Sequence, residues 1–274
     1  MNSLAYWLFT IHICFSQTSL SIVEFHPFTE KMKLLDLKPS KIEWSFDNRF
    51  LLLDEFKKEI FQLDKFGNLN SSSLLNHNPY MYGDLAWIGV SPKGIQVLDR
   101  LENQVLLFNH NLNPITNLKI DKKLFPEMAT IDSWSNLYLY SRSYNSIYVF
   151  RGNQLGKQPF IDLGKVFSNT FCVLKISINQ DFKLGILDCN GLLHIFNRNG
   201  KKEKSINTVI DEPKFLIPFR NDWLIFNRIG EGISINNQNR ISIPNSSTPL
   251  VDIANINKSL AVLSSDHILI MDVK

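Results

Sequence analysis

The sequence predicts an all-β protein, a six-bladed β-propeller, and the main evidence is a repeat. Six times, a short apolar strand ends at a small polar residue, and a second apolar strand follows a few residues later. These polar residues, which we call the anchors, are Asp54, Asp99, Ser141, Asp188, Asn227 and Ser264. Successive anchors lie 45, 42, 47, 39 and 37 residues apart. A strand-built repeat of this length is typical of one propeller blade, and such blades stand around a central channel.

Two apolar columns define the strand that ends at each anchor. Four residues before the anchors stand Phe50, Ile95, Leu137, Leu184, Trp223 and Leu260. Two residues before the anchors stand Leu52, Val97, Leu139, Ile186, Ile225 and Val262. Alternation with one strictly apolar face predicts a strand with that face buried. The positions between the columns are largely apolar as well, which fits a sheet that a neighbouring blade covers on each side.

The other strands of a blade are expected on either side of the anchor strand. Upstream apolar segments such as Leu85 to Val90 and Lys214 to Phe219 predict the innermost strands. Turn-forming residues, as in the segment Ser91 to Gly94, separate the innermost strand from the anchor strand. Downstream, Ile60 to Leu63 and its equivalents predict a third strand, and mixed segments such as Ile115 to Ile120 predict a weaker outer strand.

Two stretches resemble the NHL-type propeller repeat. Residues Asp132 to Ser141 run from an aspartate through a turn and an asparagine into an alternating strand, and Leu53 to Gly67 is similar to the second half of that repeat. The resemblance covers roughly residues 42 to 272 and implies the propeller fold. It carries over no binding residue, because the family's Gly-Asn pair after the anchor is missing and three anchors are not aspartate.

The last repeat supplies only three strands before the chain stops at Lys274. An open sheet edge at this place would leave the ring unclosed. We expect the segment Leu20 to Phe25 to add the fourth strand and so close the ring, and the segment Lys31 to Leu37 is the alternative.

The first residues differ from the rest. Met1 to Gln17 contains no charged side chain, and its centre from Leu4 to Phe15 is mostly apolar. This run is too short for a transmembrane helix and matches the hydrophobic region of a secretory signal peptide. We therefore expect a signal peptide over residues 1–17, a single propeller domain over residues 18–274, no transmembrane span, and a secreted or periplasmic protein. A buried N-terminal strand is the alternative.

Two cysteines, Cys172 and Cys189, lie in neighbouring predicted strands. If Ile178 pairs with Lys183, Cys172 lies directly opposite Cys189. Opposed residues of an antiparallel pair are close enough for a disulfide, which an exported protein can form. Two buried free thiols are the alternative.

No catalytic or cofactor motif is found. Phosphate-binding, zinc-protease, serine-hydrolase and EF-hand patterns are all absent from the sequence, and its 6 histidines are scattered. The net charge is +3 without a run of five basic residues, so a nucleic-acid partner is not indicated. We expect no catalytic residue, no cofactor and no metal. The aspartate anchors are expected to accept backbone N–H groups of the following turn, and a cation site at the channel mouth is the alternative.

Aromatic residues suggest a binding face. Tyr80 and Tyr82 lie in a loop between two blades, and Trp134 lies in a hairpin turn. Exposed aromatic rings suit a protein, peptide or glycan partner. Packing between blades is the alternative for the loop.

The function expected from the sequence is that of an exported, non-catalytic binding or scaffold module that uses one face of the propeller. The alternative is a propeller hydrolase or lyase at the mouth of the central channel. Three or more ionisable side chains converging around the channel would favour the enzyme, and an exposed aromatic-rich face would favour binding.

Overall fold

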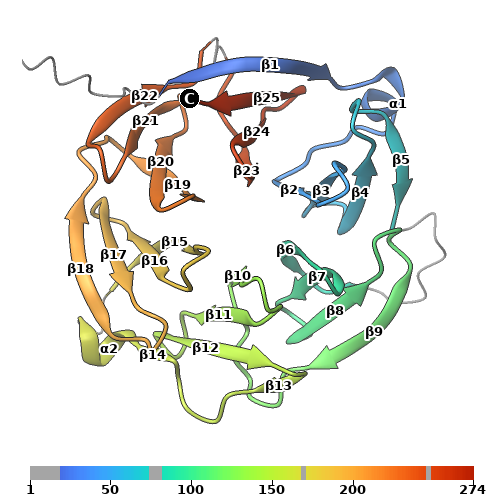
Figure 1. The fold of residues 1–274 in the computed structure, drawn as a ribbon. Coiled ribbons are helices and arrows are strands. Elements are labelled where there is room, and N and C mark those ends of the chain that lie inside the picture. Colours follow the sequence, from blue (N-terminus) through green and yellow to red (C-terminus); the bar gives the residue numbers. More distant parts are fainter. Residues whose placement is uncertain (1–18, 74–81, 168–170, 245–247) are drawn as a thin grey trace, which may run out of the picture.

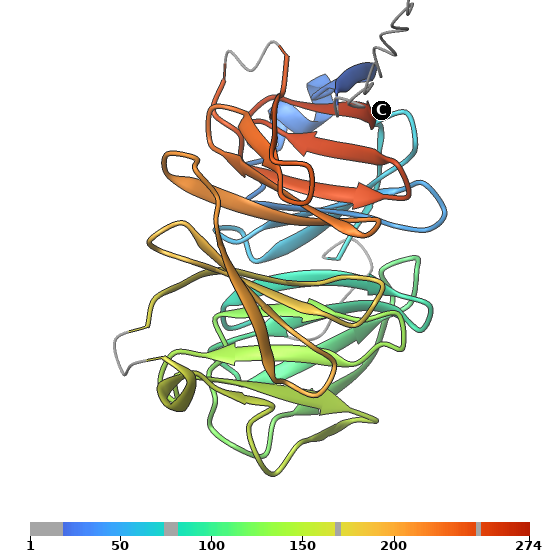
Figure 2. The same cartoon turned by 60° about the vertical axis from the view of Figure 1, so that its left-hand side comes forward.

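The chain folds into six antiparallel sheets that stand like blades around a central channel (Figure 1). The structure is a computed structural model that describes residues 19–73, 82–167, 171–244 and 248–274. Each blade runs outward from an innermost strand at the channel, and Figure 2 shows the sheets of successive blades packed against one another. The predicted all-β, six-bladed propeller is confirmed.

Within each blade the strands follow one another from the channel outward. Blade 1 comprises β2 (Lys41–Trp44), β3 (Phe50–Asp54), β4 (Glu59–Leu63) and β5 (Leu69–Ser72). Blade 2 comprises β6 (Leu85–Ser91), β7 (Gly94–Asp99), β8 (Gln104–Phe108) and β9 (Pro114–Lys119). Blade 3 comprises β10 (Met128–Ile131), β11 (Leu137–Ser141) and β12 (Ser146–Arg151), with the short strands β13 (Gln154–Leu155) and β14 (Ile161–Asp162) both paired to β12.

Blade 4 comprises β15 (Val173–Ile178), β16 (Leu184–Asp188), β17 (Leu192–Phe196) and β18 (Lys202–Asn207). Blade 5 comprises β19 (Pro213–Phe219), β20 (Asp222–Asn227), β21 (Glu231–Ser234) and β22 (Asn239–Ser242). Blade 6 comprises β23 (Asp252–Ile256), β24 (Ser259–Leu263), β25 (His267–Val273) and β1 (Leu20–Pro27). Two short helices, α1 (Glu30–Leu34) and α2 (Leu163–Val166), lie in connecting segments.

The core lies between neighbouring blades. The anchor strand β3 is buried at every position, and Leu52 and Val97 from the apolar columns are fully covered. Between blades 5 and 6, Phe226, Leu260 and Met271 belong to one apolar cluster. Each sheet is therefore covered on both faces, which explains why its inner strands read as nearly continuous apolar runs rather than as alternating ones.

The first strand of the chain completes the last blade. Strand β1 pairs antiparallel with β25, from Leu20 opposite Val273 to Pro27 opposite His267, with a bulge at Val23. Figure 1 shows β1 beside β25 at the outer rim. This confirms the predicted closure by the N-terminal strand. The alternative segment forms α1 instead, whose Met32 is buried in the core between blades 6 and 1.

The expected signal peptide, residues 1–17, lies outside the described residues. Among the residues that are described, no helix is long and apolar enough to cross a membrane.

Strands β15 and β16 pair one residue away from the expected register. Ile178 lies opposite Leu184 rather than Lys183, and a bulge at Leu174 then restores the alignment, so that Val173 lies opposite Asp188. The Cys189 N–H donates to the Cys172 carbonyl at 3.2 Å. The structure joins the two cysteines in a disulfide, with their Cα atoms 5.5 Å apart. The expected pairing of Ile178 was wrong, and the bulge is what brings the cysteines together.

Candidate functional site

Two of the aspartate anchors, Asp54 and Asp99, each hold two chain segments at once. The Asp99 carboxylate accepts the N–H of Glu102, in the following turn, at 3.2 Å. It also accepts the N–H groups of Gly83 and Asp84, in the segment that enters blade 2, at 2.8 and 2.9 Å. In the same way, the Asp54 carboxylate accepts the backbone N–H of Lys57, in the following turn, and the backbone N–H of Lys38, in the segment that enters blade 1. Turn capping was expected, and the tie to the incoming segment was missed.

The third aspartate anchor, Asp188, begins a hydrogen-bond series in blade 4 that runs from the buried Asp188 and His194 to the exposed Ser205. His194 Nε2 lies 3.0 Å from Asp188 Oδ2, and His194 Nδ1 lies 2.8 Å from Ser205 Oγ. These side chains come from β16, β17 and β18, so the series links three adjacent strands. Both ring nitrogens of His194 therefore have partners. In the described parts of the chain, no three His, Cys, Asp or Glu side chains are arranged to hold a metal ion.

Of the two described aromatic residues predicted for a binding face, Tyr82 is buried and Trp134 is exposed, and Tyr82 follows the alternative given for its loop, packing between blades. Tyr82 is only 8% exposed and packs edge-on against Phe108 in the core between blades 1 and 2, and burial raises the pKa of its hydroxyl to about 12. Tyr82 therefore offers no ring to a ligand. Trp134 is 68% exposed, next to the Phe182 ring, on a turn between an innermost strand and its anchor strand. Tyr80 lies outside the described residues.

The two faces of the propeller carry different turns. The turns that follow the anchors and the segments that enter the innermost strands lie on one face, which we call the mouth face. Because antiparallel strands alternate in direction, the turn that carries Trp134 lies on the opposite face. A binding surface that includes Trp134 is thus separate from the mouth face.

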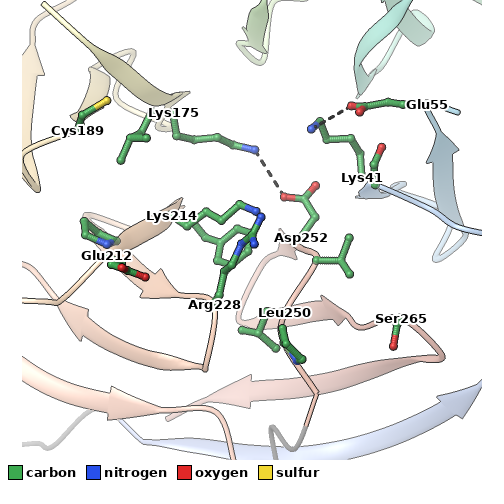
Figure 3. Close-up of a pocket in the computed structure, with 16 residues that line it drawn as sticks. Lys41, Glu55, Lys175, Cys189, Glu212, Lys214, Arg228, Leu250, Asp252 and Ser265 are labelled. Carbon is green, nitrogen blue, oxygen red and sulfur yellow. Dashed lines mark ion pairs between the residues drawn. The ribbon is translucent and has the colours of Figure 1, made fainter.

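A cavity of about 920 Å³ opens on the mouth face, and we call it the mouth cavity. Its walls come from the starts of β2, β15, β19 and β23 and from turns that follow the anchors (Figure 3). Its charged lining residues are Lys41, Glu55, Lys175, Glu212, Lys214, Arg228 and Asp252. The remaining wall is largely apolar and includes Leu174, Phe215, Leu250 and Val251.

Two of the four cations in the mouth cavity are already paired. Lys41 Nζ lies 3.1 Å from a Glu55 oxygen, and Lys175 Nζ lies 3.6 Å from Asp252 Oδ1 (Figure 3). Asp252 is 6% exposed, and its second oxygen accepts the Ile42 N–H at 3.1 Å. The Asp252 carboxylate therefore bridges blades 6, 1 and 4 at the channel.

The other two cations, Lys214 and Arg228, differ from Lys41 and Lys175 in having no ion-pair partner among the described residues. Among the described residues, no carboxylate oxygen lies within ion-pair distance of either side chain. Burial lowers the pKa of the Lys214 ammonium below its usual value, and the nearby charges of Arg228 and Lys41 lower it further. The half-buried Lys214 and the exposed Arg228 thus place positive charge in the mouth cavity, and Asp252 offsets only part of that of Lys214.

Glu43 lies deeper in the channel, two residues along β2 from Lys41, and lines a narrower space of about 160 Å³. Burial raises the pKa of Glu43 to about 8, and the negative charge of Asp252 contributes to the rise. A carboxyl group in this state carries its proton at neutral pH. Glu43 therefore adds no negative charge to the channel under those conditions.

This convergence was not anticipated from the sequence, because the charged residues come from four separate blades. One signal was present in the repeat itself. Thirteen residues before the anchors Asp54, Asp188 and Asn227 stand Lys41, Lys175 and Lys214. A column of lysines at the start of the innermost strands points to a shared place in the ring, once the ring is known to close.

No family model matches the chain, and no curated protein sequence matches it. Solved structures do match. Virginiamycin B lyase from Staphylococcus aureus, as a catalytically inactive variant with quinupristin, has a TM-score of 0.63 and 12% identity over 94% of this chain and 100% of that one. YCF48 bound to D1 peptide has a TM-score of 0.62 and 8% identity over 96% and 98%. BBS1N in complex with ARL6DN has a TM-score of 0.57 and 12% identity over 85% and 78%.

At these identities the similarity shows the fold alone. The chain is a β-propeller. The matched proteins include both a lyase and propellers in complex with a peptide or a protein.

Proposed function

We propose that this propeller is a non-catalytic binding module that takes a peptide, or a segment of a protein partner, into the mouth cavity. The observation that carries the proposal is the cavity itself: a space of about 920 Å³ with an apolar wall and two cations, Lys214 and Arg228, that form no ion pair with a described residue. Ligand sites generally fall in the range of about 300–1,000 Å³ and combine apolar walls with a few convergent polar groups.

The rigidity of the surroundings supports this proposal. The lining residues stand at the ends of innermost strands, which buried aspartates such as Asp252 and Asp54 tie to neighbouring segments. A site held in this way needs little ordering when it binds, which favours affinity. YCF48 with D1 peptide and BBS1N with ARL6DN are propellers of similar fold in complex with a peptide and a protein.

Export is also proposed. It rests on the uncharged, mostly apolar segment of residues 1–17. A secreted or periplasmic location follows from it, and N-terminal sequencing of the mature protein near residue 18 tests it.

A peptide-display selection tests the binding proposal. The exposed Ser265 lines the mouth cavity, and Ser133 is an exposed serine in a turn of the opposite face. S265W fills the cavity with a large ring, and S133W makes the same substitution away from it. We expect the unmodified protein and S133W to enrich the same peptides, and S265W to lose them. Equal enrichment by S265W, or no enrichment by the unmodified protein, would overturn the proposal.

A second function, a hydrolase or lyase at the channel mouth, is favoured by one specific observation. The pKa of Glu43 is raised and that of Lys214 is lowered, so both pKa values lie closer to neutral pH than usual, as acid-base catalysis requires. Incubation with a panel of chromogenic esters and glycosides tests it. Turnover that E43Q abolishes would favour the enzyme over the binding module.

A further inference from the structure

We infer that the ligand of the mouth cavity carries a single carboxylate group, and that Lys214 and Arg228 bind it. This inference rests on the binding function proposed above and names the chemistry that the site selects.

The cations of the mouth cavity are not equally available to a ligand. Lys41 and Lys175 already have Glu55 and Asp252 as partners, so an incoming anion gains little there. Lys214 and Arg228 have no such partner among the described residues, and Figure 3 shows both side chains directed to the same part of the cavity. Burial is the main reason why the pKa of Lys214 is lowered, and an anion placed between the two side chains offsets the repulsion by Arg228 that lowers it further.

The charge balance indicates how much negative charge the ligand brings. The cavity is lined by the cations Lys41, Lys175, Lys214 and Arg228 and by the carboxylates Glu55, Glu212 and Asp252. Four cations against three carboxylates leave an excess of one positive charge, and the protonated Glu43 adds none at neutral pH. One carboxylate balances this excess, whereas the second negative charge of a phosphate dianion would have no cation of the lining left to balance it.

The geometry of the two cations suits a carboxylate as well. A guanidinium group presents parallel N–H donors that match the two oxygens of a carboxylate, and a lysine ammonium adds a point charge. Leu174, Leu250 and Val251 provide an apolar wall in the same cavity. The ligand that fits best is therefore a peptide in which an acidic group lies next to an apolar side chain.

Selection from a random library of displayed heptapeptides tests this inference with four proteins: the unmodified chain, K214Q, R228Q and K201Q. Lys201 is an exposed lysine in the turn before β18 and serves as the matched control. We expect the unmodified protein and K201Q to enrich peptides with one Asp or Glu. K214Q and R228Q should lose that enrichment, while thermal melting shows that they remain folded.

One selected peptide is then synthesised in three forms and measured by fluorescence anisotropy. The first form is capped at both ends and keeps its acidic side chain, the second replaces that side chain by its amide, and the third has the amide side chain and a free C-terminus. We expect the amide to bind the unmodified protein about tenfold more weakly and to bind R228Q as well as the acid does. If the third form recovers the affinity, the carboxylate can come from a chain end.

The outcomes separate this inference from the binding function. Peptides that S265W loses but that show no preference for acidic residues would overturn the inference and leave the binding function standing. Acid-selective binding that persists in K214Q and R228Q would also overturn the inference. Tighter binding of a phosphoserine copy than of the acidic peptide would contradict the single charge. Failure to enrich any peptide would overturn both.

Discussion

The partly buried carboxyl group of Glu43 gives the clearest quantitative prediction. The folded chain holds Glu43 with a pKa of about 8, against 4.5 for an ordinary glutamate. Because the folded state binds this proton more tightly than the unfolded state, the group destabilises the fold as it ionises. Its stabilising effect is fully present below about pH 4.5, is lost as the pH rises towards about 8, and changes no further above that.

The size of the effect follows from the two pKa values. One pH unit between folded and unfolded pKa corresponds to about 1.4 kcal/mol. The rise from 4.5 to about 8 therefore sets an upper limit of roughly 5 kcal/mol for the pH-dependent loss. Because Glu43 lines a channel that water reaches, we expect about 2–3 kcal/mol.

The variant E43Q keeps the shape of the protonated side chain and cannot ionise. Urea unfolding at pH 5, 7 and 9 should give E43Q a growing advantage over the unmodified protein as the pH rises. E102Q, which changes an exposed glutamate in the turn after an anchor, controls for the substitution itself. Parallel stability curves for E43Q and the unmodified protein over this range would show that Glu43 does not hold its proton in this way.

Three further predictions concern stability. D99A removes the acceptor of three backbone N–H groups and should lower the free energy of unfolding in urea by roughly 3 kcal/mol. A loss of less than about 1 kcal/mol would contradict the role of Asp99 in holding the two segments. Val209 is exposed and has a φ of 52°, a backbone conformation that β-branched residues rarely adopt. We therefore expect V209N to raise the free energy of unfolding by about 1 kcal/mol. The control V23N, at an exposed valine of strand β1, should not raise it. Peptide mapping without reduction should find Cys172 linked to Cys189, and two free thiols would show that the disulfide does not form. Replacing both cysteines by serine should lower the free energy of unfolding by roughly 3 kcal/mol, because the disulfide closes a loop of the chain.

The fold was predictable from the sequence because the same positions before each anchor are apolar in all six repeats. Positions such as Leu52 and Val97 are buried in every blade, so their pattern survives even where the polar residues vary. The closure by β1 was also predictable, because three strands cannot complete a four-stranded blade. The register at Ile178 was not, since a bulge at Leu174 leaves no distinct pattern in the sequence.

The candidate site was not predictable to the same degree. Lys41 and Asp252 are far apart in the chain, and both lie at the ends of apolar segments where a charge usually reaches solvent. Ring closure brings the starts of their strands together, so that the Ile42 N–H donates to Asp252 and both Lys41 and Asp252 line the mouth cavity. For Tyr82 the sequence left two roles open, and the structure shows the second, packing between blades 1 and 2.

The proposed function depends above all on the charge of Lys214 in the mouth cavity. The ammonium group of Lys214 can be titrated by NMR with labelled lysine, and its signal is assigned from its loss in K214Q. We predict a pKa below the usual 10.5 in the free protein and a higher pKa when a selected acidic peptide is added. A pKa of 10.5 or above that the peptide leaves unchanged would contradict the claim that the mouth cavity holds excess positive charge for an anionic ligand.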